Sequence, residues 1–223
     1  MLDFASPFGD VPYTPFDLDL DAISRDAFGK SNVYLMVNGL AVIPSLHAAK
    51  PFDAVDEDGR RRTLGGASAD LQRTDFALGS QALTVIKDRS ATCREPRHGS
   101  VHHATFARAL VDFEVCAIAA YLKVLMSYSE SRLVGSQRLA RVPSQRIRLA
   151  LVMEKLLMLR VALEQLSWGE DPQARMEVAE AVYACMDALI KSAGGRSLLT
   201  GGLVQMHAAL HLVNQIYLGG DYA

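Results

Sequence analysis

Apolar residues recur at three- and four-residue steps through the second half of the chain, and this spacing limits the folds open to it. Such spacing places the apolar residues on one face of an α-helix. Two further helices are predicted at about residues 173–193 and 203–218. Because short connections join the four segments, we expect an antiparallel four-helix bundle over residues 98–223. The first two stripes consist of Phe106, Leu110, Phe113, Ala117, Tyr121 and Val124, and of Leu149, Val152, Leu156, Leu159, Leu163 and Leu166.

The second of these helices carries apolar residues beyond its main stripe. Leu151 and Leu157 extend the apolar surface around the helix, so we expect it to be buried on more than one side. The third helix has a clear start, because Asp171-Pro172 combines an N-capping side chain with a proline in the first turn.

The residues before this bundle have the pattern of short β-strands punctuated by turns. Asn38-Gly39 supplies the positive φ angles of a tight turn and predicts a hairpin, and Asp58-Gly59 predicts a second turn. We therefore expect a small β domain over residues 31–97. Its expected strands include residues 33–37, 40–43 and 82–86.

The first thirty residues are interpreted as an irregular N-terminal arm that lies on another surface. This segment contains Pro7, Pro12 and Pro15, and its aromatic residues have little else to pack against. The predicted fold class is α+β and mainly α, with a short N-terminal β domain followed by a four-helix bundle of the antiparallel type.

Composition excludes several functions. The net charge of -2 gives no reason to expect binding to nucleic acid or to an anionic membrane. The N-terminus lacks the basic and apolar regions of a secretory signal, and no apolar run is long enough to cross a bilayer. We expect a soluble, cytoplasmic protein.

A metal site is not expected. The three cysteines, Cys93, Cys116 and Cys185, lie far apart in the sequence. His207 and His211 have the one-turn spacing of zinc-protease ligands, but the glutamate of that motif and a third ligand are absent. They are interpreted as ordinary helix histidines.

Five arginines cluster between the first and second predicted helices. Guanidinium groups beside a helix N-terminus suit phosphate or pyrophosphate, because the exposed backbone N–H groups add to the positive field. A solvated face or a salt-bridged interface explains the same charges equally simply. The five residues are Arg132, Arg138, Arg141, Arg146 and Arg148.

Two short motifs in this region resemble those of a known family. Residues 131–135 read S-R-L-V-G and residues 141–145 read R-V-P-S-Q. They are similar to the R-x-Q-F-G and F-Q-x-x-Q motifs of acyl-CoA dehydrogenases, with the glycine and the last glutamine kept. In that family a β domain precedes the helical bundle, and these motifs hold the FAD of a neighbouring subunit. The resemblance covers about residues 30–223, without the family's N-terminal helical domain, and implies that Arg132 and Gln145 bind the cofactor.

The end of the chain extends the resemblance. The family has a G-G pair, an R-D pair on the next helix and then Y-E-G-T, whose glutamate is the catalytic base in many members. Aligned without a gap, Gly194 and Gly195 take the first pair, and I-Y-L-G takes the last. Leu218 therefore stands at the position of the base, and Ala209-Leu210 replaces the R-D pair. The resemblance implies that Gly194 and Gly195 are cofactor-binding and that no catalytic residue is present.

The loss of the base has a direct chemical consequence. Oxidation of a thioester requires a carboxylate that takes the α-proton while a hydride passes to the flavin, and leucine accepts no proton. Some family members take the base from an earlier helix. Here Glu114, Glu130 and Glu154 are interpreted as polar faces of their helices instead.

These features together predict an acyl-CoA dehydrogenase-like protein that does not work alone. We expect the non-catalytic or half-site subunit of a heteromeric FAD-dependent acyl-CoA dehydrogenase acting on acyl-CoA thioesters, with FAD shared with a partner subunit. The expected partner is a full-length acyl-CoA dehydrogenase-type subunit, or a second copy bound through the helical bundle. One alternative is an independent flavoenzyme of the same fold, either a dehydrogenase or a flavin-dependent monooxygenase. Another is a structural homodimer without flavin.

Overall fold

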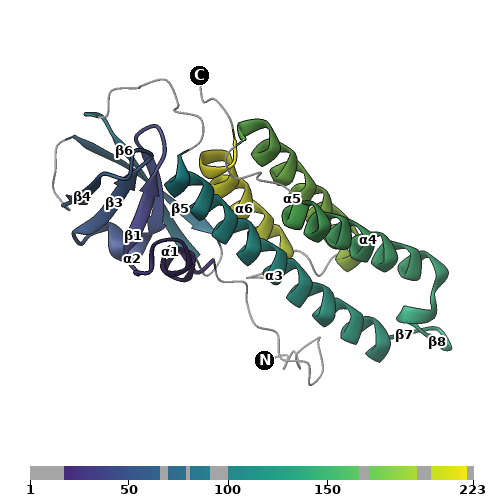
Figure 1. Cartoon of the computed structure of the whole chain (residues 1–223). Coiled ribbons are helices and arrows are strands. Elements are labelled where there is room, and N and C mark those ends of the chain that lie inside the picture. The colour runs from purple at the N-terminus through teal and green to yellow at the C-terminus, as the bar shows by residue number, and fades with distance from the viewer. Residues whose placement is uncertain are drawn as a thin grey trace, which may run out of the picture.

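The computed structural model places short strands at one end of the molecule and four long helices at the other (Figure 1). It describes residues 18–65, 70–78, 81–90, 100–165, 171–194 and 202–219. The strand part contains α1 (Leu20–Phe28), β1 (Val33–Met36), β2 (Leu40–Pro44), α2 (Ser45–Ala48), β3 (Phe52–Asp56), β4 (Arg61–Leu64), β5 (Leu71–Leu78) and β6 (Gln81–Asp88). The helical part contains α3 (Val101–Ser131), β7 (Leu133–Val134), β8 (Gln137–Arg138), the 3-10 helix η1 (Leu139–Arg141), α4 (Pro143–Gln165), α5 (Pro172–Ala193) and α6 (Leu203–Tyr217). The predicted α+β, mainly helical fold class is confirmed.

The predicted turn at Asn38-Gly39 is present, but the strands it joins do not form a hairpin. Asn38 and Gly39 have φ angles of 51° and 76°, and Val37 and Leu40 form a single antiparallel bridge. Beyond that bridge β1 pairs in parallel with β3, whereas β2 pairs with β6. Each strand is an almost unbroken apolar run, which suits burial on both faces better than a two-stranded ribbon with one wet face. The hairpin prediction is therefore wrong beyond the turn.

The two three-stranded sheets have the orders β1-β3-β4 and β2-β6-β5. The predicted strand at residues 82–86 is confirmed as the centre of β6. The predicted turn at Asp58-Gly59 joins β3 to β4, where the Gly59 N–H donates to the carbonyl of Asp56. Gly59 has a φ of 78°, and a Cβ there would clash with Nε2 of His102. The turn thus packs closely against the His102 side chain in the first turn of α3, so a larger residue would strain the backbone and push that side chain aside.

Helix α1 corrects the prediction of an irregular arm for residues 20–28. Asp19 caps its start by accepting a hydrogen bond from the Ala22 N–H at 2.8 Å, and Gly29 ends it in the left-handed conformation. Phe28 stacks on Phe106 of α3 with ring centroids 5.9 Å apart, so the helix covers the bundle. Residues 1–17, which include the three prolines, lie outside the described part of the chain.

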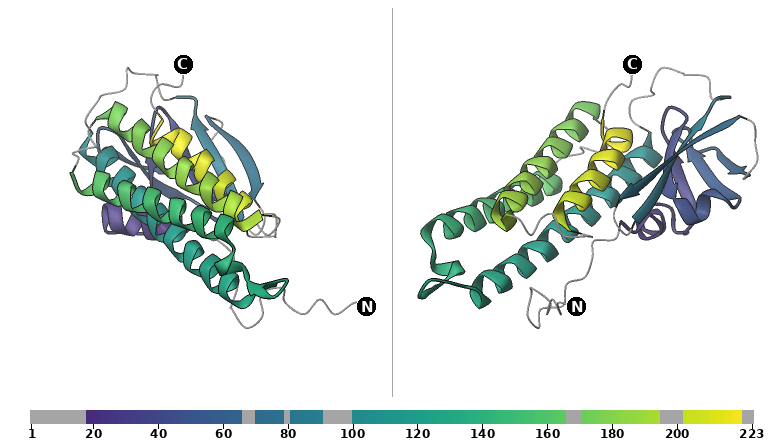
Figure 2. Two further views of the ribbon diagram at one scale, coloured as in Figure 1. Left: turned by 90° about the vertical axis from the view of Figure 1, so that its right-hand side faces the viewer. Right: turned by 180° about the vertical axis from the view of Figure 1, so that it is seen from behind.

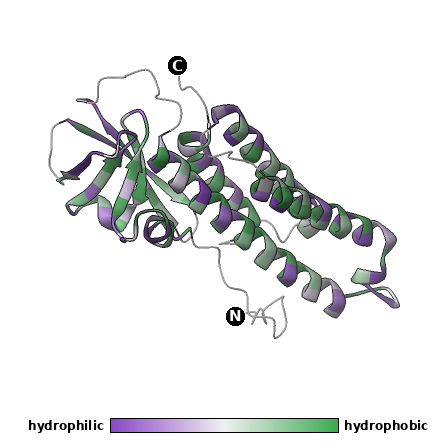
Figure 3. Ribbon diagram, in the orientation of Figure 1, coloured by the Kyte–Doolittle hydropathy of each residue, from purple (hydrophilic) through white to green (hydrophobic). Residues whose placement is uncertain are grey.

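The four long helices form the predicted bundle beside the sheets (Figure 2), and hydrophobic residues run along their length (Figure 3). Asp171 caps α5 and Pro172 occupies its first position, as predicted. No helix in the described ranges is both long and apolar enough to cross a membrane. One hydrophobic cluster extends from the sheets into the bundle, where the rings of Phe106 and Tyr217 lie 4.7 Å apart.

Helix α4 is buried on one side only within this chain. Its inner stripe packs against α5 as expected, through Val152, Leu156, Leu159 and Leu163. The opposite side is exposed, so the prediction of burial on more than one side is wrong for the isolated chain. We call the exposed apolar residues of that side the α4 outer stripe, which consists of Ile147, Leu151, Leu157, Met158 and Val161.

Candidate functional site

The C-terminal end of α6 is fixed between the two sheets. The Tyr217 hydroxyl accepts a hydrogen bond from the Val42 N–H of β2 at 2.8 Å and donates one to the Leu35 carbonyl of β1 at 3.2 Å. Tyr217 is fully buried, and burial raises the pKa of its hydroxyl above the usual value. Because β1 and β2 diverge into different sheets, this one side chain joins both sheets to the bundle.

His103 closes the same end of α6 from the first turn of α3. Its Nε2 lies 2.6 Å from the Tyr217 carbonyl oxygen, a group left without a partner by the end of the helix. Burial lowers the pKa of His103 to about 4, with a further contribution from the positive charge of Arg175. The imidazole is therefore neutral near pH 7 and donates through Nε2. Its Nδ1 lies 4.0 Å from the Glu57 carboxylate of the β3–β4 turn.

The stability of the protein should fall in mild acid because of His103. The pKa of a histidine in the unfolded chain is near 6.5, so the folded protein binds this proton less readily than the unfolded chain does. The contribution of neutral His103 to the free energy of unfolding is therefore complete only above pH 6.5. We expect roughly 2–3 kcal/mol to be lost between pH 6.5 and pH 4, as measured by urea unfolding. The control is His103→Gln, whose amide still donates but does not titrate. Groups common to both proteins, such as Glu114 with its raised pKa and opposite trend, cancel in the comparison. Equal pH dependence in the two proteins would contradict the assignment.

Leu218, which the resemblance aligned with the family's base, is fully buried and belongs to the hydrophobic core. Its N–H donates to the Asn214 carbonyl at 2.8 Å, so the helix ends in ordinary geometry. Ala209 and Leu210, which replace the R-D pair, are fully buried as well. Apolar side chains thus occupy the positions that the resemblance of the motifs aligned with charged groups of the family.

Glu114 is not on a polar face, which corrects the interpretation from the sequence. It is fully buried in α3 and lies beside the buried Asn214 of α6, one turn before Leu218. In the described part of the chain, no side-chain oxygen or nitrogen of either residue completes a hydrogen bond of good geometry. Burial raises the pKa of Glu114 well above its usual value, while Asn214 acts in the opposite direction.

The other two candidate carboxylates are exposed. Glu130, near the end of α3, lies 3.7 Å from Arg138, which agrees with its interpretation as a polar residue. Glu154 is exposed too, but the side of α4 that it occupies is the apolar outer stripe rather than a polar face.

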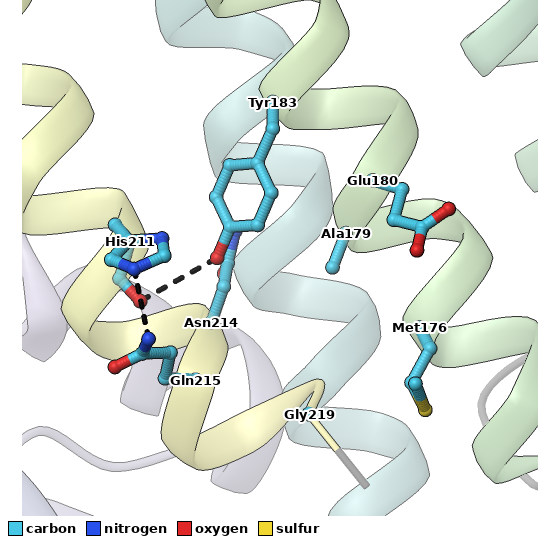
Figure 4. A pocket seen from close by; sticks show the side chains of 8 residues that line it. All are labelled: Met176, Ala179, Glu180, Tyr183, His211, Asn214, Gln215 and Gly219. Carbon is cyan, nitrogen blue, oxygen red and sulfur yellow. Dashed lines mark hydrogen bonds between the residues drawn. The ribbon is translucent and has the colours of Figure 1, made fainter.

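A pocket of about 250 Å³ lies between α5 and α6 (Figure 4). Tyr183 forms one wall, with its ring centroid 6.0 Å from that of His207 and 5.2 Å from that of His211. The two imidazoles are stacked, and His211 Nε2 lies 2.8 Å from the Gln215 amide. Among the described residues no three potential metal ligands come together. The residues lining the pocket are Met176, Ala179, Glu180, Tyr183, His211, Asn214, Gln215 and Gly219.

Three of the predicted cofactor-binding residues gather at the other end of the bundle. Arg132 caps the C-terminal end of α3, is exposed, and has its guanidinium 5.7 Å from the centre of the Tyr128 ring. Gln145 is buried at the start of α4 and donates to the Ser192 carbonyl at 3.2 Å, which ties α4 to the end of α5. Gly194 caps that end of α5, while Gly195 lies outside the described residues.

These residues are far from Leu218. The C-terminal end of α6 contacts His103 at the start of α3, whereas Arg132 follows the last residue of α3. With a rise of about 1.5 Å per residue, the two ends are roughly 40 Å apart. Figure 1 shows β7 and β8, which follow α3, at the end of the molecule away from the sheets, and α6 between that end and the sheets. Within one chain, no single dinucleotide molecule contacts both.

The arginine cluster also lies at this far end, around β7, β8 and the start of α4. The Arg148 guanidinium donates to the Lys191 carbonyl at 3.2 Å, and Arg138 pairs with Glu130. Arg148 thus connects α4 to α5, and Arg138 connects β8 to α3. Both contacts agree with the interpretation of these arginines as part of a salt-bridged interface. Arg132, Arg138, Arg141, Arg146 and Arg148 are all exposed.

Comparisons with known proteins identify the fold. No protein-family profile and no curated protein matches the sequence. Among solved structures, the ChsE4-ChsE5 complex from Mycobacterium tuberculosis matches with a TM-score of 0.53 and 17% identity, over 86% of this chain and 60% of that one. A glutaryl-CoA dehydrogenase from Mycobacterium smegmatis in complex with FADH2 matches with a TM-score of 0.54 and 12% identity, over 86% and 58%.

A third structure, PigA with FAD and proline, matches with a TM-score of 0.53 and 15% identity, over 82% of this chain and 56% of that one. The chain therefore spans less than two thirds of the length of these proteins. Its fold is acyl-CoA dehydrogenase-like, as the resemblance of its motifs implied.

Proposed function

We propose that the protein is the non-catalytic or half-site subunit of a heteromeric FAD-dependent acyl-CoA dehydrogenase. The observation that carries the proposal is the buried, apolar Leu218 at the position that the resemblance assigns to the base. Arg132, Gln145 and Gly194 lie at one end of the bundle, and the buried Leu218 lies at the other. A chain arranged in this way can complete a neighbour's cofactor site without having a catalytic site of its own.

The residues at the far end suit the phosphates of a dinucleotide held mainly by another subunit. Arg132 is exposed and offers a planar set of donors that matches phosphate oxygens. Gly194 ends α5 with a φ of 60°, a conformation that favours glycine. Gln145 uses its amide N–H to brace α5, so its role would be to position these elements. When bound, FAD supplies the hydride acceptor for thioester oxidation.

The α4 outer stripe supports an assembly with another subunit. Contiguous exposed apolar residues of this size are uncommon on a monomer and usually mark an interface. The stripe begins at Ile147, close to the arginine cluster, so a partner seated on α4 would bring its own surface near Arg132. The match to ChsE4-ChsE5, a complex of two different chains, is consistent with this arrangement.

Co-expression with a full-length acyl-CoA dehydrogenase subunit from the same host tests the proposal. We expect the protein to be colourless alone, and flavin absorbance and thioester-dependent dye reduction to appear in the joint assembly. Flavin bound by the chain alone would instead favour an independent flavoenzyme. A colourless dimer indifferent to every such subunit would favour a structural homodimer.

Replacing Arg132 should separate cofactor retention from assembly. We expect Arg132→Ala to weaken flavin binding by the joint assembly roughly tenfold, because one charge-assisted phosphate contact contributes on the order of 1.5–3 kcal/mol before solvent exposure reduces it. Association of the subunits should be unchanged. The control is Arg61→Ala, an exposed arginine on β4 at the opposite end of the molecule. Equal flavin retention by the two variants, measured by absorbance after gel filtration, would remove Arg132 from the site.

A further inference from the structure

The centre of the α4 outer stripe is occupied by a carboxylate. Ile147, Leu151, Glu154, Met158 and Val161 follow one another at steps of four, three, four and three residues. This spacing forms the straight seam that a helix presents to another helix in coiled-coil packing. The four apolar members are between 46% and 66% exposed, and Leu157, at 60%, widens the seam.

Glu154 has no cation within its own helix to neutralise it. The residues three and four positions away, which are its neighbours on a helix surface, are Ala150, Leu151, Leu157 and Met158. Lys155 is adjacent in sequence and therefore projects to another side of the helix. No ion pair to Glu154 is found in the described ranges. A partner that covers the stripe must therefore supply the opposite charge or bury this carboxylate uncompensated.

A second copy of the chain places a like charge, and not an opposite one, directly across from Glu154. The contact that buries most of the stripe against itself places the two-fold axis at its midpoint, where residue 154 meets residue 154 of the copy. Ile147 would then lie opposite Val161, which suits an apolar contact. The two Glu154 carboxylates would be brought together in surroundings depleted of water, which is strongly unfavourable.

We infer that the α4 outer stripe binds an apolar helix of an unlike subunit, with a lysine or arginine of that subunit opposite Glu154. The inference rests on the proposed function and adds the chemistry of the partner's surface. A single charged residue in an otherwise apolar seam is a known means of selecting one partner over another. Glu154 thus acts against self-association and in favour of a helix with a central cation.

A charge-reversed copy of the chain serves as the partner surrogate, so the test needs no flavin and no identified partner. Sedimentation is measured for the wild type alone, for Glu154→Lys alone, and for their equimolar mixture. We expect the mixture to form a one-to-one complex roughly 100-fold tighter than either protein forms with itself, because opposite charges replace like charges at the axis. A third variant, Glu154→Leu, has an unbroken apolar seam and should form a homodimer.

Leu157→Glu, introduced into both members of the mixture, is the control that assigns the association to the stripe, and it should abolish the complex. Wild-type self-association as tight as that of the mixture would overturn the inference, as would failure of both the mixture and Glu154→Leu to associate. Because no activity is measured, such a result leaves the flavin and thioester assays of the joint assembly to decide the proposed function separately.

Discussion

Replacing Tyr217 by alanine should destabilise the protein by about 5 kcal/mol, enough to unfold many domains of this size. Removing a buried aromatic ring costs about 3–5 kcal/mol through lost contacts and the cavity left behind. The ring of Phe106, 4.7 Å away, loses its neighbour. The Val42 N–H and the Leu35 carbonyl also lose their hydrogen-bond partner in a buried setting. The two sheets would then be joined to the bundle far less firmly. Urea unfolding at pH 7 measures the effect.

Two matched variants divide this cost. Tyr217→Phe keeps the ring and removes only the hydroxyl, so we expect about 1–3 kcal/mol. Tyr121→Ala removes the same side chain from a half-buried position on α3 and should cost clearly less than Tyr217→Ala. If Tyr217→Ala and Tyr121→Ala proved equally destabilising, Tyr217 would not be the residue that joins the sheets to the bundle.

Local sequence signals predicted the positions of helix starts and turns well, whereas the pairing of the strands depended on tertiary packing. Asp171-Pro172 fixes the start of α5 because capping and the φ of proline are determined by the residues themselves. Asn38-Gly39 fixes a turn for the same reason. Nothing in those two residues determines which strands β1 and β2 pair with. The unbroken apolar runs of β1 and β2 indicate burial on both faces, and this was the signal against a simple hairpin.

The orientation of α3 is the part of the site that periodicity could not settle. Apolar residues occur on several sides of this helix, so Leu110 fits a stripe with Phe113 and Ala117, as predicted, and equally a second stripe with Ile118. The structure buries the side that carries Leu110, Glu114 and Ile118 fully. Glu114 lies four residues from both Leu110 and Ile118, and residues at this spacing share one face of a helix. This spacing could have revealed Glu114 as buried. Helix α1 was missed because its apolar stripe is only two turns long, although Asp19 and Gly29 carried ordinary capping signals.

Placing a glutamate at position 218, which the resemblance aligns with the family's base, should not confer catalysis. We expect Leu218→Glu to lose about 3–5 kcal/mol of stability and to show no thioester-dependent dye reduction, alone or with added FAD. Leu218 is fully buried among apolar residues, so the new carboxyl would hold its proton instead of accepting one. Ala209 and Leu210 would still stand in place of the arginine and aspartate.

Two further substitutions separate the charge from the position. Leu218→Met keeps an apolar side chain of similar volume and should cost less than about 1.5 kcal/mol. Val204→Glu places the same carboxylate in the first turn of α6, where 39% of the side chain is exposed and the helix dipole favours a negative charge, so its effect should be small. Thermal unfolding ranks the three variants, and dye reduction with acyl-CoA thioesters tests activity. Appreciable oxidation by Leu218→Glu would mean that the rest of a catalytic site is intact, and the protein would then be a dehydrogenase lacking one residue instead of a partner built without a site.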